Sequence, residues 1–112
     1  MLTTADAMKS EDRAILDDLA ARVRERFPSA HIWAFGSRAR GEASADSDLD
    51  VCVVLDHLDR ASEWALTDIA CDVGYDHELL ITIVRYSREE LEEGPWAASP
   101  LVRTIRREGV AA

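Results

Sequence analysis

The chain has 112 residues, of which 47% are hydrophobic and 31% are charged, and its formal net charge is −9 at pH 7. This length fits one small domain, and no apolar stretch resembles a secretion signal or approaches the roughly 20 residues of a membrane-spanning helix, so we expect a cytoplasmic protein without membrane contact. The acidic balance argues against direct contact with nucleic acid, because nucleic-acid-binding proteins usually present a basic face to the phosphates.

The first half of the chain predicts two strands that each follow a helix or a loop. Apolar residues recur at helical spacing after Ser10, a candidate capping residue, until Pro28 interrupts the pattern. The strand before Leu55 is apolar on both faces, as a central strand requires. The predicted elements are a helix over 10–27, a strand over 31–35, a brief helix over 37–41, a polar loop over 42–47 and a strand over 48–55.

The second half predicts one more strand and three helices. Ser87 and Glu90 form a capping box, and Ser99 precedes a proline that suits the first turn of a helix. The predicted elements are a helix from Asp59 or Ser62 to Gly74, a strand over 78–86, a helix from Ser87 and a last helix that ends before Gly109. This order indicates an α/β sandwich of two or three layers and leaves the strand directions open.

Residues 36–51 contain the groups that suit phosphate chemistry. Gly36 and Ser37 lie where a strand turns into a helix, and backbone N–H groups at such a turn attract anions. Glycine lets a phosphate approach the backbone, and serine adds a hydroxyl donor. Arg38 and Arg40 place positive charge nearby. These four residues are candidates for holding the phosphates of a nucleotide.

Asp48 and Asp50 lie two residues apart on a predicted strand, so their carboxylates are expected on one face. Two like charges at this spacing disfavour each other unless a cation joins them, and Mg²⁺ binds one or two carboxylates together with substrate phosphates. The alternative is that Gly-Ser is only a turn and that Asp-X-Asp is only a solvated pair. The segment lacks the spacing of a P-loop, a dinucleotide-binding loop or an EF-hand.

Gly-Ser, ten intervening residues and Asp-X-Asp together resemble the signature of the DNA polymerase β-like nucleotidyltransferase superfamily. The segments Ala39-Arg40-Gly41 and Ser47-Asp48-Leu49-Asp50, with the C-terminal stretch from Ser99, resemble its minimal branch, the MNT domains. The resemblance runs from about Ser10 onward.

The resemblance implies a mixed β-sheet flanked by helices in a single domain. It implies that Gly36 and Ser37 hold the triphosphate of ATP, and that Asp48 and Asp50 hold Mg²⁺ while AMP is transferred to a hydroxyl. Domains of this branch often pair with a HEPN ribonuclease toxin and act as antitoxins that modify it. A HEPN-type toxin is therefore the expected partner.

The chain departs from the superfamily at its third carboxylate. The corresponding position falls near Thr82, which cannot act as a base. Glu78 lies four residues earlier on the predicted strand and shares its face, so it is either a substitute catalytic base or a solvated residue at the strand end.

This departure keeps a second function open, that of a nucleotide-binding antitoxin that neutralises its partner by contact with little or no catalysis. Transfer to a small molecule is a third reading, but relatives with that activity carry a further domain for the acceptor. The remaining expectations are two reduced core cysteines, three surface or strand-edge histidines, and three tryptophans that act as core or interface anchors.

Overall fold

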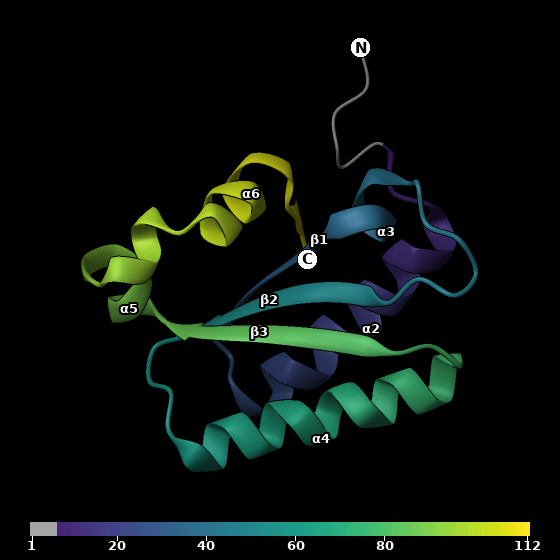
Figure 1. The fold of residues 1–112 in the computed structure, drawn as a ribbon. Coiled ribbons are helices and arrows are strands. Elements are labelled where there is room, and N and C mark those ends of the chain that lie inside the picture. Colours follow the sequence, from purple (N-terminus) through teal and green to yellow (C-terminus); the bar gives the residue numbers. More distant parts are fainter. Residues whose placement is uncertain (1–6) are drawn as a thin grey trace.

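The computed structural model describes residues 7–112 and contains a four-stranded sheet with helices on both faces (Figure 1). The elements are α2 (Ser10–Arg26), β1 (His31–Phe35), α3 (Gly36–Arg40), β2 (Leu49–Leu55), α4 (Arg60–His77), β3 (Ile81–Ser87), α5 (Arg88–Glu93), the 3₁₀ helix η1 (Pro95–Ala98), α6 (Pro100–Glu108) and β4 (Val110–Ala111). No helix within this range is both long and apolar enough to cross a membrane.

The sheet is mixed, with the strand order β3-β2-β1-β4. Strand β1 pairs antiparallel with both β2 and β4, whereas β2 and β3 are parallel and are joined through α4. A helical crossover is the usual connection between parallel neighbours. The predicted mixed sheet flanked by helices is confirmed, and the strand directions that periodicity left open are now defined.

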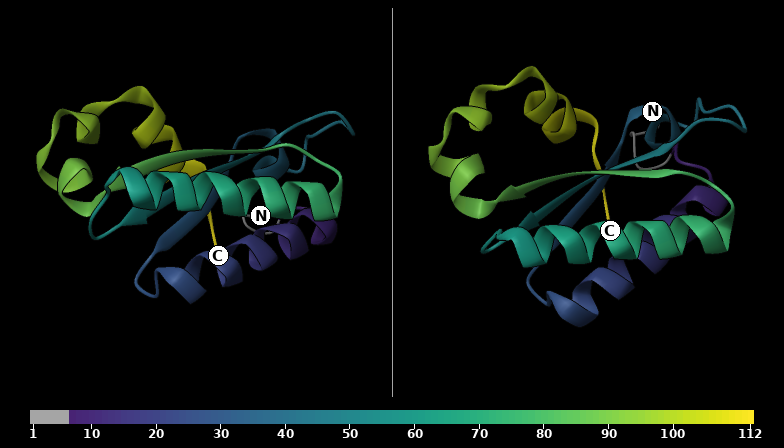
Figure 2. Two further views of the ribbon diagram at one scale, coloured as in Figure 1. Left: turned by 90° about the horizontal axis from the view of Figure 1, so that it is seen from below. Right: turned by 60° about the horizontal axis from the view of Figure 1, so that its bottom comes forward.

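The two faces of the sheet carry different helices. Helices α2 and α4 cover one face, where they bury the alternate β2 residues Val51 and Val53 with Leu16 and Leu66. Helices α5 and α6 lie across part of the other face, where a second cluster includes Cys52, Val54 and Val102. Figure 2 shows this division, with α3 and α6 on the side opposite α4.

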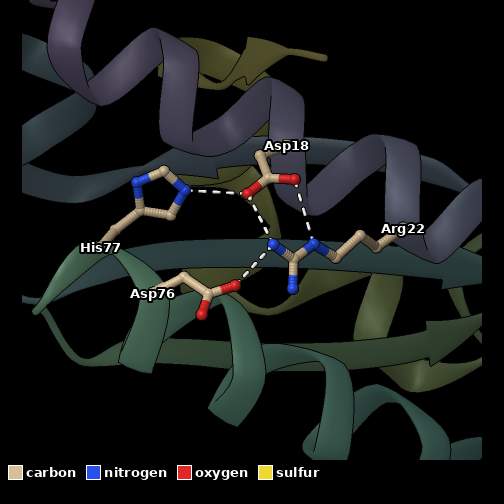
Figure 3. Close-up of polar contacts among 4 residues, drawn as sticks. All are labelled: Asp18, Arg22, Asp76 and His77. Atoms are coloured by element: carbon tan, nitrogen blue, oxygen red, sulfur yellow. Dashed lines mark hydrogen bonds and ion pairs between the residues drawn. The ribbon is translucent and has the colours of Figure 1, made fainter.

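A polar cluster joins α2 to the C-terminal end of α4 (Figure 3). Arg22 donates to both carboxylate oxygens of Asp18, at 3.0 and 3.1 Å, and reaches Asp76 at 2.7 Å. His77 Nε2 lies 2.8 Å from the same Asp18. The hydrogen bond from His77, followed by that from Arg22, lowers the pKa of Asp18 despite its partial burial. The cluster fixes the two helices side by side beneath the sheet.

Several boundaries differ from the sequence prediction. Ser10 is the first helical residue of α2, because Lys9 occupies the N-cap and makes no side-chain hydrogen bond there. Helix α4 begins after Asp59, which forms a capping box with Ser62, and it continues past Gly74 to His77. A Cβ at Gly74 would lie 2.6 Å from the carbonyl oxygen of Leu79, so this glycine permits close packing rather than ending the helix.

The C-terminal strand is an element that the pattern did not predict. Strand β4 follows α6 directly, and Val110 is fully buried against β1. The N–H of Ala112 donates to the carbonyl of Ile32 at 2.9 Å, and Arg24 donates to the carbonyl of Ala112 at 2.9 Å. Two residues are too short a run to show an alternating pattern.

The cysteine and tryptophan expectations hold only in part. Cys52 is buried, and burial raises its pKa to about 12, but Cys71 is exposed on α4, so the prediction of a second core cysteine is wrong. Trp33 is half-buried beside the second cluster, whereas Trp64 is 64% exposed. The side chain of Trp96 lies outside the described residues.

Candidate functional site

Asp50 lies near the start of β2, on the sheet face opposite α4. Its register partners are Phe35 on β1 and Thr82 on β3, and it shares its face with Cys52. Asp48 is exposed and directly precedes the strand. Burial, and next the negative charge of Asp48, raise the pKa of Asp50. The structure therefore brings the two predicted carboxylates together, close enough for the charge of Asp48 to act on Asp50.

Gly36 lies against the Asp50 carboxylate. It begins α3 directly after β1, and its φ of 79° is a left-handed conformation that favours glycine. A Cβ at this position would lie 2.6 Å from Oδ2 of Asp50. The first and last parts of the predicted motif thus meet in space, and the hydrogen-only side chain of Gly36 leaves the carboxylate in place.

Ser37 follows Gly36 in the first turn of α3. Within residues 7–112 its hydroxyl has no hydrogen-bond partner, whereas its carbonyl accepts from Glu42 at 2.9 Å. Helix α3 ends at Gly41, which adopts a φ of 73° and turns the chain into the loop that leads to Asp48. The short helix therefore connects the Gly-Ser turn to the paired carboxylates.

The side chain of Arg38 binds other protein groups, whereas the sequence predicted that it binds phosphate. Its guanidinium donates to the carbonyl of Ser47 at 2.8 Å and to Oδ1 of Asp12 at 2.8 Å, with a longer contact to Ala45. The side chains of Arg38 and Asp12 are 12% and 6% exposed. Arg38 thus holds the loop before Asp48 against α2, and the expectation that it binds phosphate gains no support.

Asp12 is the partner of Arg38 that the sequence reasoning missed. It lies one helical turn before the buried Leu16, on the face of α2 that packs against the sheet. A carboxylate on the buried face of an amphipathic helix needs a partner, and this signal was available in the pattern.

Arg40 remains close to the candidate site. It forms exposed ion pairs at 3.0 Å with Glu42 and with Glu108 of α6, and its charge lowers the pKa of Asp50, against the effects of burial and Asp48. Of the two predicted arginines, Arg40 is the one whose charge lowers the pKa of Asp50.

Glu78 does not lie on a strand. It caps the C-terminus of α4 in a left-handed conformation with a φ of 57°, and β3 begins three residues later. The premise that Glu78 shares a strand face with Thr82 is therefore wrong, because the α4 helix extends further than its glycine suggested. The residue beside Asp50 on β3 is Thr82, which has no carboxylate.

The donor set fits a divalent cation that also binds phosphate. The pKa of Asp50 is raised by burial first and by the charge of Asp48 second, and such a pair of carboxylates suits Mg²⁺ that completes its shell with phosphate oxygens and water. In the described part of the chain, no group of three or more His, Cys, Asp or Glu side chains could hold a metal by itself.

Comparison with known proteins agrees with this geometry. The family model of the nucleotidyltransferase domain matches residues 16–109. The chain belongs to the nucleotidyltransferase domain family. The match spans β1, α3 and β2, the elements that carry Gly36 and Asp50, and extends through α6.

A curated relative and a solved structure illustrate what this nucleotidyltransferase domain is similar to. Over 47 residues it is 39% identical to a Haemophilus influenzae protein named probable protein adenylyltransferase MntA, a match that covers 42% of this chain and 39% of the relative. The fold matches a chain in the crystal structure of the toxin-antitoxin MntA-HepT with a TM-score of 0.54, at 16% identity, over 88% of this chain and 69% of that chain. The expected nucleotidyltransferase family and fold are confirmed.

Proposed function

We propose that this domain transfers AMP from ATP to a hydroxyl group of a protein, in a reaction that requires Mg²⁺. The observation that carries the proposal is the contact between Gly36 and Asp50, with Asp48 beside them, because it joins a phosphate-accessible turn to a paired-carboxylate site. The name of the Haemophilus influenzae relative supports the choice of AMP and of a protein acceptor.

Each residue of the site has a proposed task. The backbone at Gly36 and the hydroxyl of Ser37 bind phosphate oxygens of ATP, and the charge of Arg40 offsets negative charge next to Asp50. Asp48 and Asp50 hold Mg²⁺, which supplies charge stabilisation at the phosphates when it is bound. Arg38 orients the loop that presents Asp48.

We further propose that the acceptor is a HEPN-type toxin and that the domain is its cytoplasmic antitoxin. The family resemblance implies such a partner, and the fold match to a chain of a toxin-antitoxin complex supports it. The acidic net charge of −9 suits a protein partner better than direct contact with nucleic acid.

A second function is favoured by one observation, which is that Thr82 rather than a carboxylate lies beside Asp50. An attacking hydroxyl needs a base or a metal that lowers its pKa. If neither is effective here, the domain binds nucleotide and neutralises its partner by contact alone. Glu78 caps α4 and does not lie on β3. It therefore stays a candidate base only if its side chain reaches the site from the end of α4.

Radiolabelled ATP, Mg²⁺ and a purified candidate toxin provide the test. Asp48→Asn and Asp50→Asn should each abolish label transfer, because each removes a metal ligand worth several kcal/mol. Asp46→Asn is the matched control, since Asp46 is exposed in the same loop and outside the pair. Transfer at the wild-type rate by either variant would refute the metal assignment.

The same assay separates the two functions. Wild-type protein that binds ATP and its partner but transfers no label would establish the contact-only antitoxin. A Glu78→Gln variant that transfers normally would remove Glu78 from the catalytic residues, whereas a loss of about 10²-fold in rate with unchanged ATP affinity would retain it.

A further inference from the structure

The outer face of α4 carries an apolar stripe that no part of residues 7–112 covers. Trp64, Cys71 and Tyr75 lie at positions i, i+7 and i+11 of the helix, a spacing that places them on one face. Trp64 is 64% exposed and Tyr75 is 86% exposed. Large aromatic side chains bury well and are enriched at protein interfaces, so two of them exposed on one helical face mark a contact surface.

The stripe continues into a groove at the C-terminal end of α4. The groove is lined by Cys71 and Tyr75 on the helix and by Leu80 on the segment that leads into β3, with Gly74 at its base. Leu80 is 66% exposed. A surface that combines an aromatic stripe with a groove fits an elongated segment with its own apolar face. We call Trp64, Cys71, Tyr75 and Leu80 the α4 surface.

Acidic residues lie within and beside the α4 surface. Asp68, four residues after Trp64, is exposed on the same helical face, Asp72 is exposed beside it, and Glu78 lines the groove. Two copies of this chain would bring like charges together, and each copy already carries a net charge of −9. The complementary occupant is therefore a different protein whose apolar residues are flanked by arginine or lysine.

We propose that the α4 surface docks a basic amphipathic helix of a partner protein. The inference stands apart from the proposed transfer reaction, because α4 covers one face of the sheet (Figure 2). Asp50 shares the opposite face with Cys52. A helix bound to α4 leaves Gly36, Asp48 and Asp50 open to nucleotide.

Cys71 provides a native reporter for the test. It is the exposed member of the two cysteines, whereas Cys52 is buried and its pKa is raised to about 12, so iodoacetamide should alkylate Cys71 alone in the folded chain. The probe is a synthetic helix of about 20 residues, with leucine along one face and arginine on its flanks. Its control carries glutamate in place of arginine.

The full chain should show saturable protection of Cys71 by the arginine peptide and none by the glutamate peptide. The double variant Trp64→Ser/Tyr75→Ser should bind the arginine peptide about tenfold more weakly or worse, as expected for aromatic anchors. The variant Leu101→Ser is the matched control, because Leu101 is an exposed apolar residue on α6 and should leave protection unchanged. Circular dichroism checks that each variant is folded.

Three results would overturn the proposal. They are the absence of protection at peptide concentrations up to the millimolar range, equal protection by both peptides, and equal protection in wild-type protein and in the folded double variant. Self-association that the double variant abolishes, measured by light scattering without peptide, would assign the surface to a second copy instead.

Discussion

At the scale of single residues, Asp50 is held where its charge is unfavourable. Because the pKa of Asp50 is raised in the folded state, ionisation destabilises the fold as pH rises from below the ordinary value of 3.8 through the raised pKa. We predict that Asp50→Asn increases the melting temperature relative to wild type at pH 7 and that this difference shrinks toward pH 3. Thermal unfolding without divalent cations measures it.

Mg²⁺ provides the control for that prediction. It should raise the melting temperature of wild type at pH 7 and leave Asp50→Asn nearly unchanged, because only the ionised pair attracts the cation. A difference between variant and wild type that does not vary with pH would show that the charge of Asp50 is not the cause.

The second prediction for a single residue concerns Gly36. Gly36→Ala should destabilise the fold by about 1–2 kcal/mol, because its φ is positive and its Cβ would press on Oδ2 of Asp50. In an Asp50→Ala background the contact is absent, so the same substitution should cost less. Urea unfolding of the four proteins measures this coupling. Equal costs in both backgrounds would mean that Gly36 is required for its backbone conformation alone.

At the scale of elements, the buried pair of Arg38 and Asp12 joins α2, α3 and the loop before β2. Arg38→Ala should lower the free energy of unfolding by about 3 kcal/mol, because it leaves the carboxylate of Asp12 buried without a cation. Within the described residues Oδ2 of Asp12 already lacks a hydrogen-bond partner, which makes Oδ1 the atom that Arg38 satisfies. Denaturant unfolding provides the value.

The exposed pair of Arg13 and Asp17 on the same helix is the comparison for that experiment. Arg13→Ala should cost no more than about 0.5 kcal/mol, as surface pairs one turn apart usually do. Similar losses for Arg13→Ala and Arg38→Ala would show that burial of the Arg38 pair has little effect on stability.

At the scale of the whole molecule, the last strand completes the core. We predict that Val110→Ala destabilises the domain by about 2 kcal/mol, because the Val110 side chain is fully buried in the core on the sheet face that α2 covers. Ala111→Ser, at the exposed neighbouring position, should be close to neutral. Thermal and urea unfolding compare them, and a loss below about 0.5 kcal/mol for Val110→Ala would contradict the assigned packing.

The sequence predicted most of the architecture because its signals were local. Ser87 with Glu90 and Ser99 with Pro100 defined two helix starts correctly, since capping depends only on neighbouring residues. It failed where a tertiary contact overruled the local signal. Gly74 continues the helix because the chain folds back on it, which moved Glu78 off the predicted strand.

In the candidate site too, local signals were predictive and tertiary contacts were not. The meeting of the Gly-Ser turn with Asp50 was predictable, because the motif spacing carries it, and the structure places Gly36 against Asp50. The pattern indicated that Asp12 needs a partner but not which one, because Arg38 lies 26 positions away on another helix. Phosphate binding by Arg38 and Arg40 therefore stays a prediction, and for Arg38 the structure shows contacts with Asp12 and Ser47.

The pairing of β4 with β1 has a consequence for synthesis of the chain on the ribosome. Strand β1 is interior to the sheet, yet the hydrogen bonds on one of its sides come from residues at 110–112. The chain is translated at about 5–20 residues per second, so this edge of β1 stays open until residues 110–112 emerge. A nascent chain that lacks these residues would expose an apolar strand edge, the feature that promotes aggregation. Pairing on this side of β1 is thus possible only after translation has passed β4.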